Sequence, residues 1–208
     1  TLSLLVGSDD SQKIDCFEAC PADQRAIDIF RCHQGSGVVW LDRAAVEDAH
    51  LCAFVLEAGG DEEQAIAALL HDVPEDCGGE IRLTEILEMF GPRVERMVRG
   101  CSDSLVADRE DKAPWRERKQ AHIDHVASAD MDTLIVTAAD KTHNGRAIAT
   151  DLQTIGSAVW DRFNASREDI IWYYTTFYNE LAKRGVTPAL LNPLRTAIEI
   201  MKKIGRAS

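Results

Sequence analysis

The residues best suited to chemistry lie between Ala67 and Asp76, where the sequence reads AALLHDVPED. An apolar run typical of a helix leads into His71 and Asp72, and Glu75 and Asp76 follow directly. The two members of each His-Glu and Asp-Asp pair are four residues apart, and such positions share one face of a helix. One imidazole and three carboxylates can therefore converge beside buried apolar side chains, where their polarity needs compensation. The alternative is a solvated helix end, since carboxylates are common there.

A second polar group ends another apolar stretch, residues 137–146, which reads TAADKTHNGR. Asp140 and Asn144 are four residues apart in it and so share a helix face. If the two stretches meet, an imidazole and several carboxylates surround one point. Mixed nitrogen and oxygen ligands of this kind suit Mn²⁺, Fe²⁺ or Zn²⁺ better than an ion that selects thiolates.

Together the two stretches resemble the HD superfamily of metal-dependent phosphohydrolases. Within it they are most similar to the RelA/SpoT-type hydrolase domains and the stand-alone small alarmone hydrolases. The shared pattern is His-Asp, then Glu-Asp, then a distant Asp followed four residues later by Asn. The likeness covers roughly residues 56 to 180 and includes the segments Phe90–Val94, Trp115–Lys119, Val159–Asn164 and Trp172–Tyr174.

The resemblance implies a role for each polar residue of the two stretches. The implied metal ligands are His71, Asp72 and Asp140, and the resemblance favours Mn²⁺ as the ion. Glu75 and Asp76 would orient the attacking water or take its proton. Asn144 would contact the substrate, and Lys141 is a candidate for a phosphate contact; the alternative for Lys141 is a solvated helix face.

The first histidine of the family pattern lies on the helix before a Gly-Gly turn. His50 is the histidine in that region, and we expect it to be a metal ligand. The usual family spacing falls about one helical turn earlier, at Glu47, which shares a helix face with His50. Glu47 is therefore the alternative ligand, His33 is a more remote one, and His50 as a core residue is the structural alternative. Residues 34–40 also lack the Arg-Lys pair and the Pro-Tyr that precede this histidine in the family.

Apolar periodicity and breakers predict an all-α protein, an HD-domain helical bundle. We expect an irregular segment at 1–24 and a single helical domain at 25–208. Asp61 and Gln64 form the signature of a capping box, and Pro74 should end the helix that they begin. The expected helices are 26–31, 41–57, 61–73, 83–90, one starting at Pro92, 115–127, 131–150, 166–184 and 187–204, with a loop at 102–114.

Bulk properties narrow the classes of partner. The chain has 208 residues, 45% of them hydrophobic, and a formal net charge of −12. This charge disfavours nucleic acids and acidic membranes, so we expect a small-molecule substrate. The apolar runs of the sequence are too short to span a bilayer. The sequence has six cysteines but no Cys-x-x-Cys motif, so we expect reduced thiols and a cytoplasmic location.

By resemblance, the expected activity is hydrolysis of guanosine 3′,5′-bis(diphosphate)-type alarmones, releasing the 3′-pyrophosphate. Within 208 residues we expect a stand-alone hydrolase without a synthetase segment. One alternative is an HD phosphatase that acts on another nucleotide, such as NADPH. The other is a degenerate, non-catalytic HD domain that binds a nucleotide or a partner protein.

Overall fold

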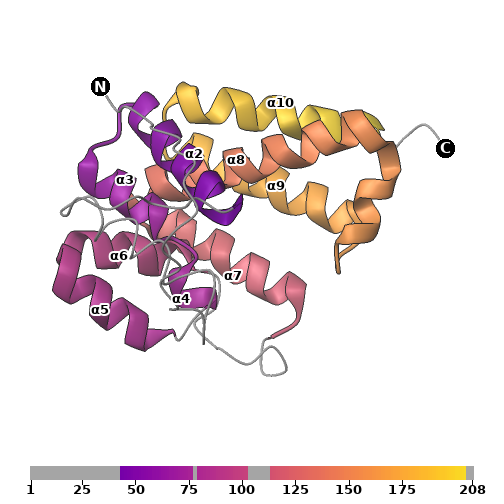
Figure 1. Cartoon of the computed structure of the whole chain (residues 1–208). Helices are drawn as coiled ribbons and strands as arrows, with labels where there is room; N and C mark the ends of the chain where they lie inside the picture. The colour runs from indigo at the N-terminus through magenta and orange to yellow at the C-terminus, as the bar shows by residue number, and fades with distance from the viewer. Residues whose placement is uncertain (1–42, 77–78, 103–112, 205–208) are drawn as a thin grey trace, which may run out of the picture.

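The computed structural model describes residues 43–76, 79–102 and 113–204, apart from the side chains of residues 43–49 and 76. Every regular element in these ranges is helical, which confirms the expected all-α bundle (Figure 1). The expected irregular segment at 1–24 and helix at 26–31 lie outside the described residues, as does most of the expected loop at 102–114. The single domain at 25–208 therefore stays a prediction.

The helices follow one another with short connections. In chain order they are α2 (Arg43–Glu57), α3 (Glu62–Leu69), α4 (Val73–Asp76), α5 (Glu80–Phe90), α6 (Pro92–Cys101), α7 (Trp115–Ser128), α8 (Met131–Ile155), the 3₁₀-helix η2 (Gly156–Arg162), α9 (Arg167–Lys183) and α10 (Pro188–Ile204).

Helix α8 is the centre of the bundle, and Figure 1 shows it running alongside α10. It also packs against α2, α3, α6, α9 and η2, so its buried side chains face several neighbours. The side chain of Asp130 caps its start by accepting a hydrogen bond from the backbone N–H of Thr133 at 2.9 Å. The helix runs past the expected end at residue 150, because the first breaker is Gly156 with φ of +66°.

Helix α3 begins as expected but ends earlier. The capping box of Asp61 and Gln64 is present in both directions, at 2.9 and 3.0 Å. The helix stops at Leu69, and Pro74 lies in the first turn of α4, where a missing N–H leaves no helical hydrogen bond unmade. The expectation of one helix up to Pro74 was wrong, because proline is tolerated at a helix start as well as after a helix end. His71 and Asp72 therefore lie in a turn between two helices.

One arginine joins the helices that position this turn. Arg93, near the start of α6, bonds Asp61 and Glu63 at the start of α3 and Asp132 at the start of α8. The three N···O distances are 2.7, 2.5 and 2.8 Å respectively. Charge-assisted hydrogen bonds are among the strong ones, so Arg93 fixes how α3 sits on α8.

No helix in the described part of the chain is long and apolar enough to cross a membrane. Two of the cysteines, Cys52 and Cys101, fall within the described residues, and both are free thiols. The other four, at positions 16, 20, 32 and 77, lie outside the described residues.

Candidate metal centre

His71 is buried, with 7% of its surface exposed, in the turn that follows α3. Its Nδ1 lies 2.8 Å from the carbonyl oxygen of Ala68. A carbonyl can only accept, so Nδ1 carries a proton and the ring orientation is fixed. Nε2 then faces two carboxylates, 3.1 Å from Oδ2 of Asp72 and 3.6 Å from Oδ1 of Asp140. This is the arrangement in which proteins present a histidine to a metal ion, with the other ring nitrogen held by a backbone carbonyl.

Asp140 comes from the middle of α8 and is 4% exposed. Its Oδ2 is 2.5 Å from Nζ of Lys141, and its Oδ1 accepts a hydrogen bond from Nδ2 of Asn144 at 2.5 Å. Lys141 is largely buried, while Asn144 is exposed at the surface. Both residues therefore act on Asp140 directly, whatever contact they make with a ligand.

The pKa values of the clustered side chains show that opposite charges stabilise one another there. Burial acts to lower the pKa of His71, but the Asp72 and Asp140 carboxylates outweigh it and raise the pKa to about 10. Desolvation acts to raise the pKa of Asp72, but the neighbouring His71, with Lys141 and Lys119, lowers it to about 2. The pKa of Lys141 rises well above its usual value despite burial, because Asp140 is adjacent. The negative charges of Asp72 and Asp140 therefore favour a positive charge beside them. In this structure the side chains of His71 and Lys141 occupy that position.

The donor types suit a divalent ion, and two distances between donor atoms are close to the spacing of metal ligands. With metal–ligand bonds near 2.1 Å, neighbouring ligand atoms lie about 3.0 to 3.4 Å apart. Nε2 of His71 is at 3.1 and 3.6 Å from its two carboxylate oxygens, close to that spacing. As the side chains stand, no group of three or more His, Cys, Asp or Glu residues closes around an ion position within the described part of the chain. Both oxygens of Asp140 are bonded to Lys141 and Asn144 instead.

The expected first ligand lies on α2. His50 is exposed there, and the centroid of its ring is 6.5 Å from that of His143 on α8. His143 follows Asp140 by three residues and so shares its side of α8. His50 is thus on the helix that faces the Asp140 region, and its role as a ligand stays a prediction. The side chain of Glu47 and the whole of His33 lie outside the described residues.

The two expected catalytic carboxylates come from α4. Glu75 is half-buried, and its backbone N–H donates to the carbonyl oxygen of Asp72 at 3.0 Å. The backbone of Asp76 belongs to α4, but its side chain lies outside the described residues. Because His71 and Asp72 lie in a turn before α4, the expected single helix face shared by His71 and Glu75 is not formed. The backbone hydrogen bond to Asp72 keeps the Glu75 backbone next to this turn.

Sequence reasoning missed Cys101, at the end of α6. It is buried, with Sγ 3.3 Å from the hydroxyl of Thr137, which lies one turn before Asp140. Burial raises the pKa of its thiol to about 12, and the charges of Asp72 and Asp140 act in the same direction. Cys101 therefore packs as a buried, protonated thiol next to the cluster. No motif around Cys101 in the sequence predicts this position.

Comparison with known proteins identifies the fold and its relatives. The HD domain family matches residues 39–171. The chain is 31% identical over 96 residues to the bifunctional (p)ppGpp synthase/hydrolase SpoT of Escherichia coli K12, covering 43% of this chain and 12% of SpoT. It is 31% identical over 94 residues to the guanosine-3′,5′-bis(diphosphate) 3′-pyrophosphohydrolase MESH1 of Drosophila melanogaster, covering 45% of this chain and 48% of MESH1.

Among solved structures, that of lmo0812 from Listeria monocytogenes EGD-e superposes with a TM-score of 0.63. The match has 24% sequence identity and covers 77% of this chain and 99% of lmo0812, so it supports the fold. The resemblance to the RelA/SpoT-type hydrolases is confirmed. The family match spans most of the chain and includes both halves of the His-Asp and Asp-Asn cluster. The protein belongs to the HD-domain family.

Proposed function

We propose that this protein is a metal-dependent phosphohydrolase that removes the 3′-pyrophosphate from guanosine 3′,5′-bis(diphosphate)-type alarmones. The observation that carries the proposal is the contact of Nε2 of His71 with carboxylates from two separate elements. The similarity to SpoT and MESH1 supports the choice of substrate.

His71, Asp72 and Asp140 would hold the metal ion, with His50 or Glu47 as a further ligand from α2. HD-domain hydrolases depend on a divalent metal, and we propose Mn²⁺. When bound, such an ion supplies Lewis acidity and lowers the pKa of water. Asp140 would ligate through Oδ1, the oxygen that faces His71, while its Oδ2 keeps the contact with Lys141.

Glu75 and Asp76 would orient the attacking water and accept its proton. The hydrogen bond from the backbone N–H of Glu75 to the carbonyl oxygen of Asp72 supports this for Glu75, because it keeps Glu75 close to a proposed ligand. Asn144 and Lys141 would bind the substrate, one as a hydrogen-bond donor and the other as a point charge. Lys119 adds positive charge on the same side, since it acts on the pKa of Asp72.

The test is turnover by the purified chain. We expect pyrophosphate release from guanosine 3′,5′-bis(diphosphate) with Mn²⁺ present and none after chelation. NADPH and other nucleotides serve as competing substrates. Faster turnover of one of them would overturn the alarmone assignment and keep the phosphohydrolase.

A second candidate function is nucleotide binding without turnover. The engagement of both Asp140 oxygens by Lys141 and Asn144 favours it, because the pair can stand in for a metal ion. Metal content separates the two functions. About one tightly held ion per chain supports the hydrolase, whereas none after Mn²⁺ soaking, with nucleotide still bound, supports the binder.

A further inference from the structure

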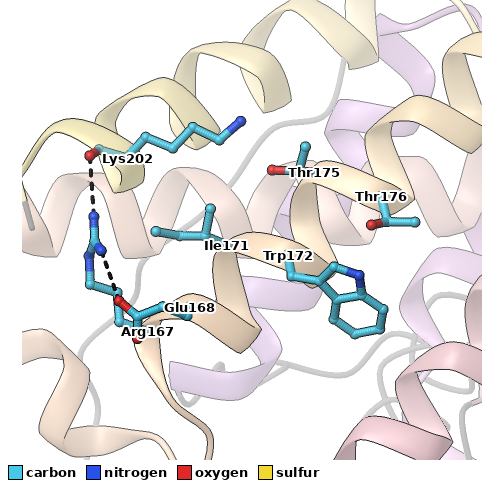
Figure 2. Close-up of a pocket in the computed structure, with 7 residues that line it drawn as sticks. All are labelled: Arg167, Glu168, Ile171, Trp172, Thr175, Thr176 and Lys202. Atoms are coloured by element: carbon cyan, nitrogen blue, oxygen red, sulfur yellow. Dashed lines mark hydrogen bonds and ion pairs between the residues drawn. The ribbon is translucent and has the colours of Figure 1, made fainter.

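A pocket lies between α9 and α10, on helices that carry none of the proposed metal ligands (Figure 2). Its volume is about 420 Å³, within the usual range for sites that bind small organic molecules. Six lining residues follow α9 from Arg167 to Thr176, and Lys202 faces them from α10. The two helices thus supply a polar end and an apolar floor.

One end of the pocket is suited to an anion. In Figure 2 the Lys202 side chain extends along α10 toward the end of the pocket that carries Thr175 and Thr176. Within the described residues the ammonium of Lys202 has no carboxylate partner, although acidic side chains outnumber basic ones in the whole sequence by 35 to 23. The Lys202 ammonium offers three donors to a carboxylate or phosphate group at this end of the pocket.

Two wall atoms lack hydrogen bonds. Oγ1 of Thr175 and Nε of Arg167 are buried and have no partner among the described residues. The rest of the Arg167 guanidinium is committed, to Glu168 and to the carbonyl oxygens of Met201 and Lys202. Buried polar groups without partners cost free energy, so each is commonly satisfied by water or by a ligand.

The part of the pocket between the Arg167–Glu168 end and the two threonines is suited to a flat apolar body. Ile171 and the indole of Trp172 line it. The guanidinium carbon of Arg116 lies 3.5 Å from the centroid of the Trp172 ring, and an ion pair with Asp169 holds that guanidinium in place. The indole is therefore fixed before any ligand arrives, which lowers the entropy cost of stacking a ring against it.

We propose that this pocket binds a small organic anion with a flat aromatic body. Its carboxylate or phosphate group pairs with Lys202 and accepts a hydrogen bond from Thr175. Its ring packs on Ile171 and Trp172. The site is separate from the proposed metal centre and does not depend on the proposed function.

The test is titration of the whole chain with guanosine 5′-monophosphate and with indole-3-acetate. Inorganic phosphate, which has the anionic group but no ring, and guanosine, which has the ring but no anionic group, serve as comparisons. Binding is followed through the NMR signal of the Trp172 indole N–H, which a Trp172→Phe variant identifies. A stronger response to the nucleotide assigns a phosphate head group, a stronger response to indole-3-acetate assigns a carboxylate, and either supports the site.

We expect Lys202→Ala to weaken binding about tenfold, since it removes a charge-assisted hydrogen bond. Thr175→Val keeps the side-chain shape and should also weaken binding. Lys203→Ala removes the neighbouring, exposed lysine of α10 and should leave the affinity unchanged. Asp140→Asn alters the proposed metal centre and should also leave it unchanged. The proposal is overturned if neither anion moves the Trp172 signal, if Lys202→Ala binds as well as the parent chain, or if Asp140→Asn abolishes binding.

Discussion

Nε2 of His71 lies 3.6 Å from Oδ1 of Asp140, although α3 and α8 are separated in sequence by four further helices. The proximity follows from packing of α3 on α8. Arg93 reinforces it by bonding acidic side chains at the start of both helices. Because α3 ends at Leu69, the backbone turns there and His71 points back at the centre of α8.

Replacing Asp140 by Asn tests whether this contact is catalytic. The variant keeps the shape of the side chain but loses the charge that would hold a cation. We expect activity on guanosine 3′,5′-bis(diphosphate) to fall at least about 100-fold, with loss of bound metal. Pyrophosphate release and metal analysis of the purified protein measure the two effects.

Asp151→Asn is the matched control for this change. Asp151 lies on the same helix, at the surface, where it pairs with Arg162 at 2.8 Å. Surface pairs contribute little, so this variant should behave as the parent chain. Unchanged activity in Asp140→Asn would remove Asp140 from the mechanism.

Asn144→Ala separates two roles that share one residue. The Asn144 amide donates to Asp140 at 2.5 Å, so it can orient a metal ligand as well as contact substrate. A positioning role predicts metal affinity about 10- to 100-fold weaker. A substrate contact alone predicts a higher KM with metal affinity unchanged. Gln153→Ala, an exposed change on α8, is the control, and no effect of Asn144→Ala on either quantity would contradict both roles.

The residue pattern indicated that His71 and Asp140 lie near the core, because each follows an apolar run that is buried in the bundle. His71 and Asp140 were accessible to sequence reasoning for that reason. The end of α3 was not, because Pro74 is compatible both with a helix end and with a helix start.

The engagement of Asp140 by Lys141 was not predictable either. From the sequence, a lysine that follows an aspartate can equally lie on a solvated helix face. Only the packing of the helices determines whether it is buried. The pocket between α9 and α10 is a further case. Its residues come from two helices whose relative position no local motif specifies, and neither Lys202 nor Thr175 stands out in the sequence.

The first metal ligand can be assigned by comparing His50→Ala with Glu47→Gln. Both positions lie on α2, three residues apart, so one turn of helix separates the two hypotheses. Whichever residue ligates, its replacement should weaken metal binding about 10-fold or more. The other replacement should leave binding unchanged. Calorimetric titration with Mn²⁺ measures both, and two unaffected variants would mean that α2 supplies no ligand.

Arg93→Gln tests the link between α3 and α8, and its effect should depend on pH. The variant loses charge-assisted hydrogen bonds to Asp61, Glu63 and Asp132. The guanidinium is partly exposed, so we expect the free energy of unfolding to fall by about 1–2 kcal/mol at neutral pH. Urea denaturation measures this. Arg162→Gln, which breaks an exposed pair with Asp151, should cost less.

The pH dependence follows from Asp61. The hydrogen bond from Arg93 holds the pKa of Asp61 below its usual value in the folded chain. The unfolded chain therefore binds the proton more readily, so this stabilisation is present above an unfolded pKa of about 3.9 and is lost as the pH falls through the lower folded value. The parent chain should lose stability more steeply than Arg93→Gln between about pH 5 and pH 3. Parallel stability curves for the two proteins would show that Arg93 does not stabilise the ionised form of Asp61.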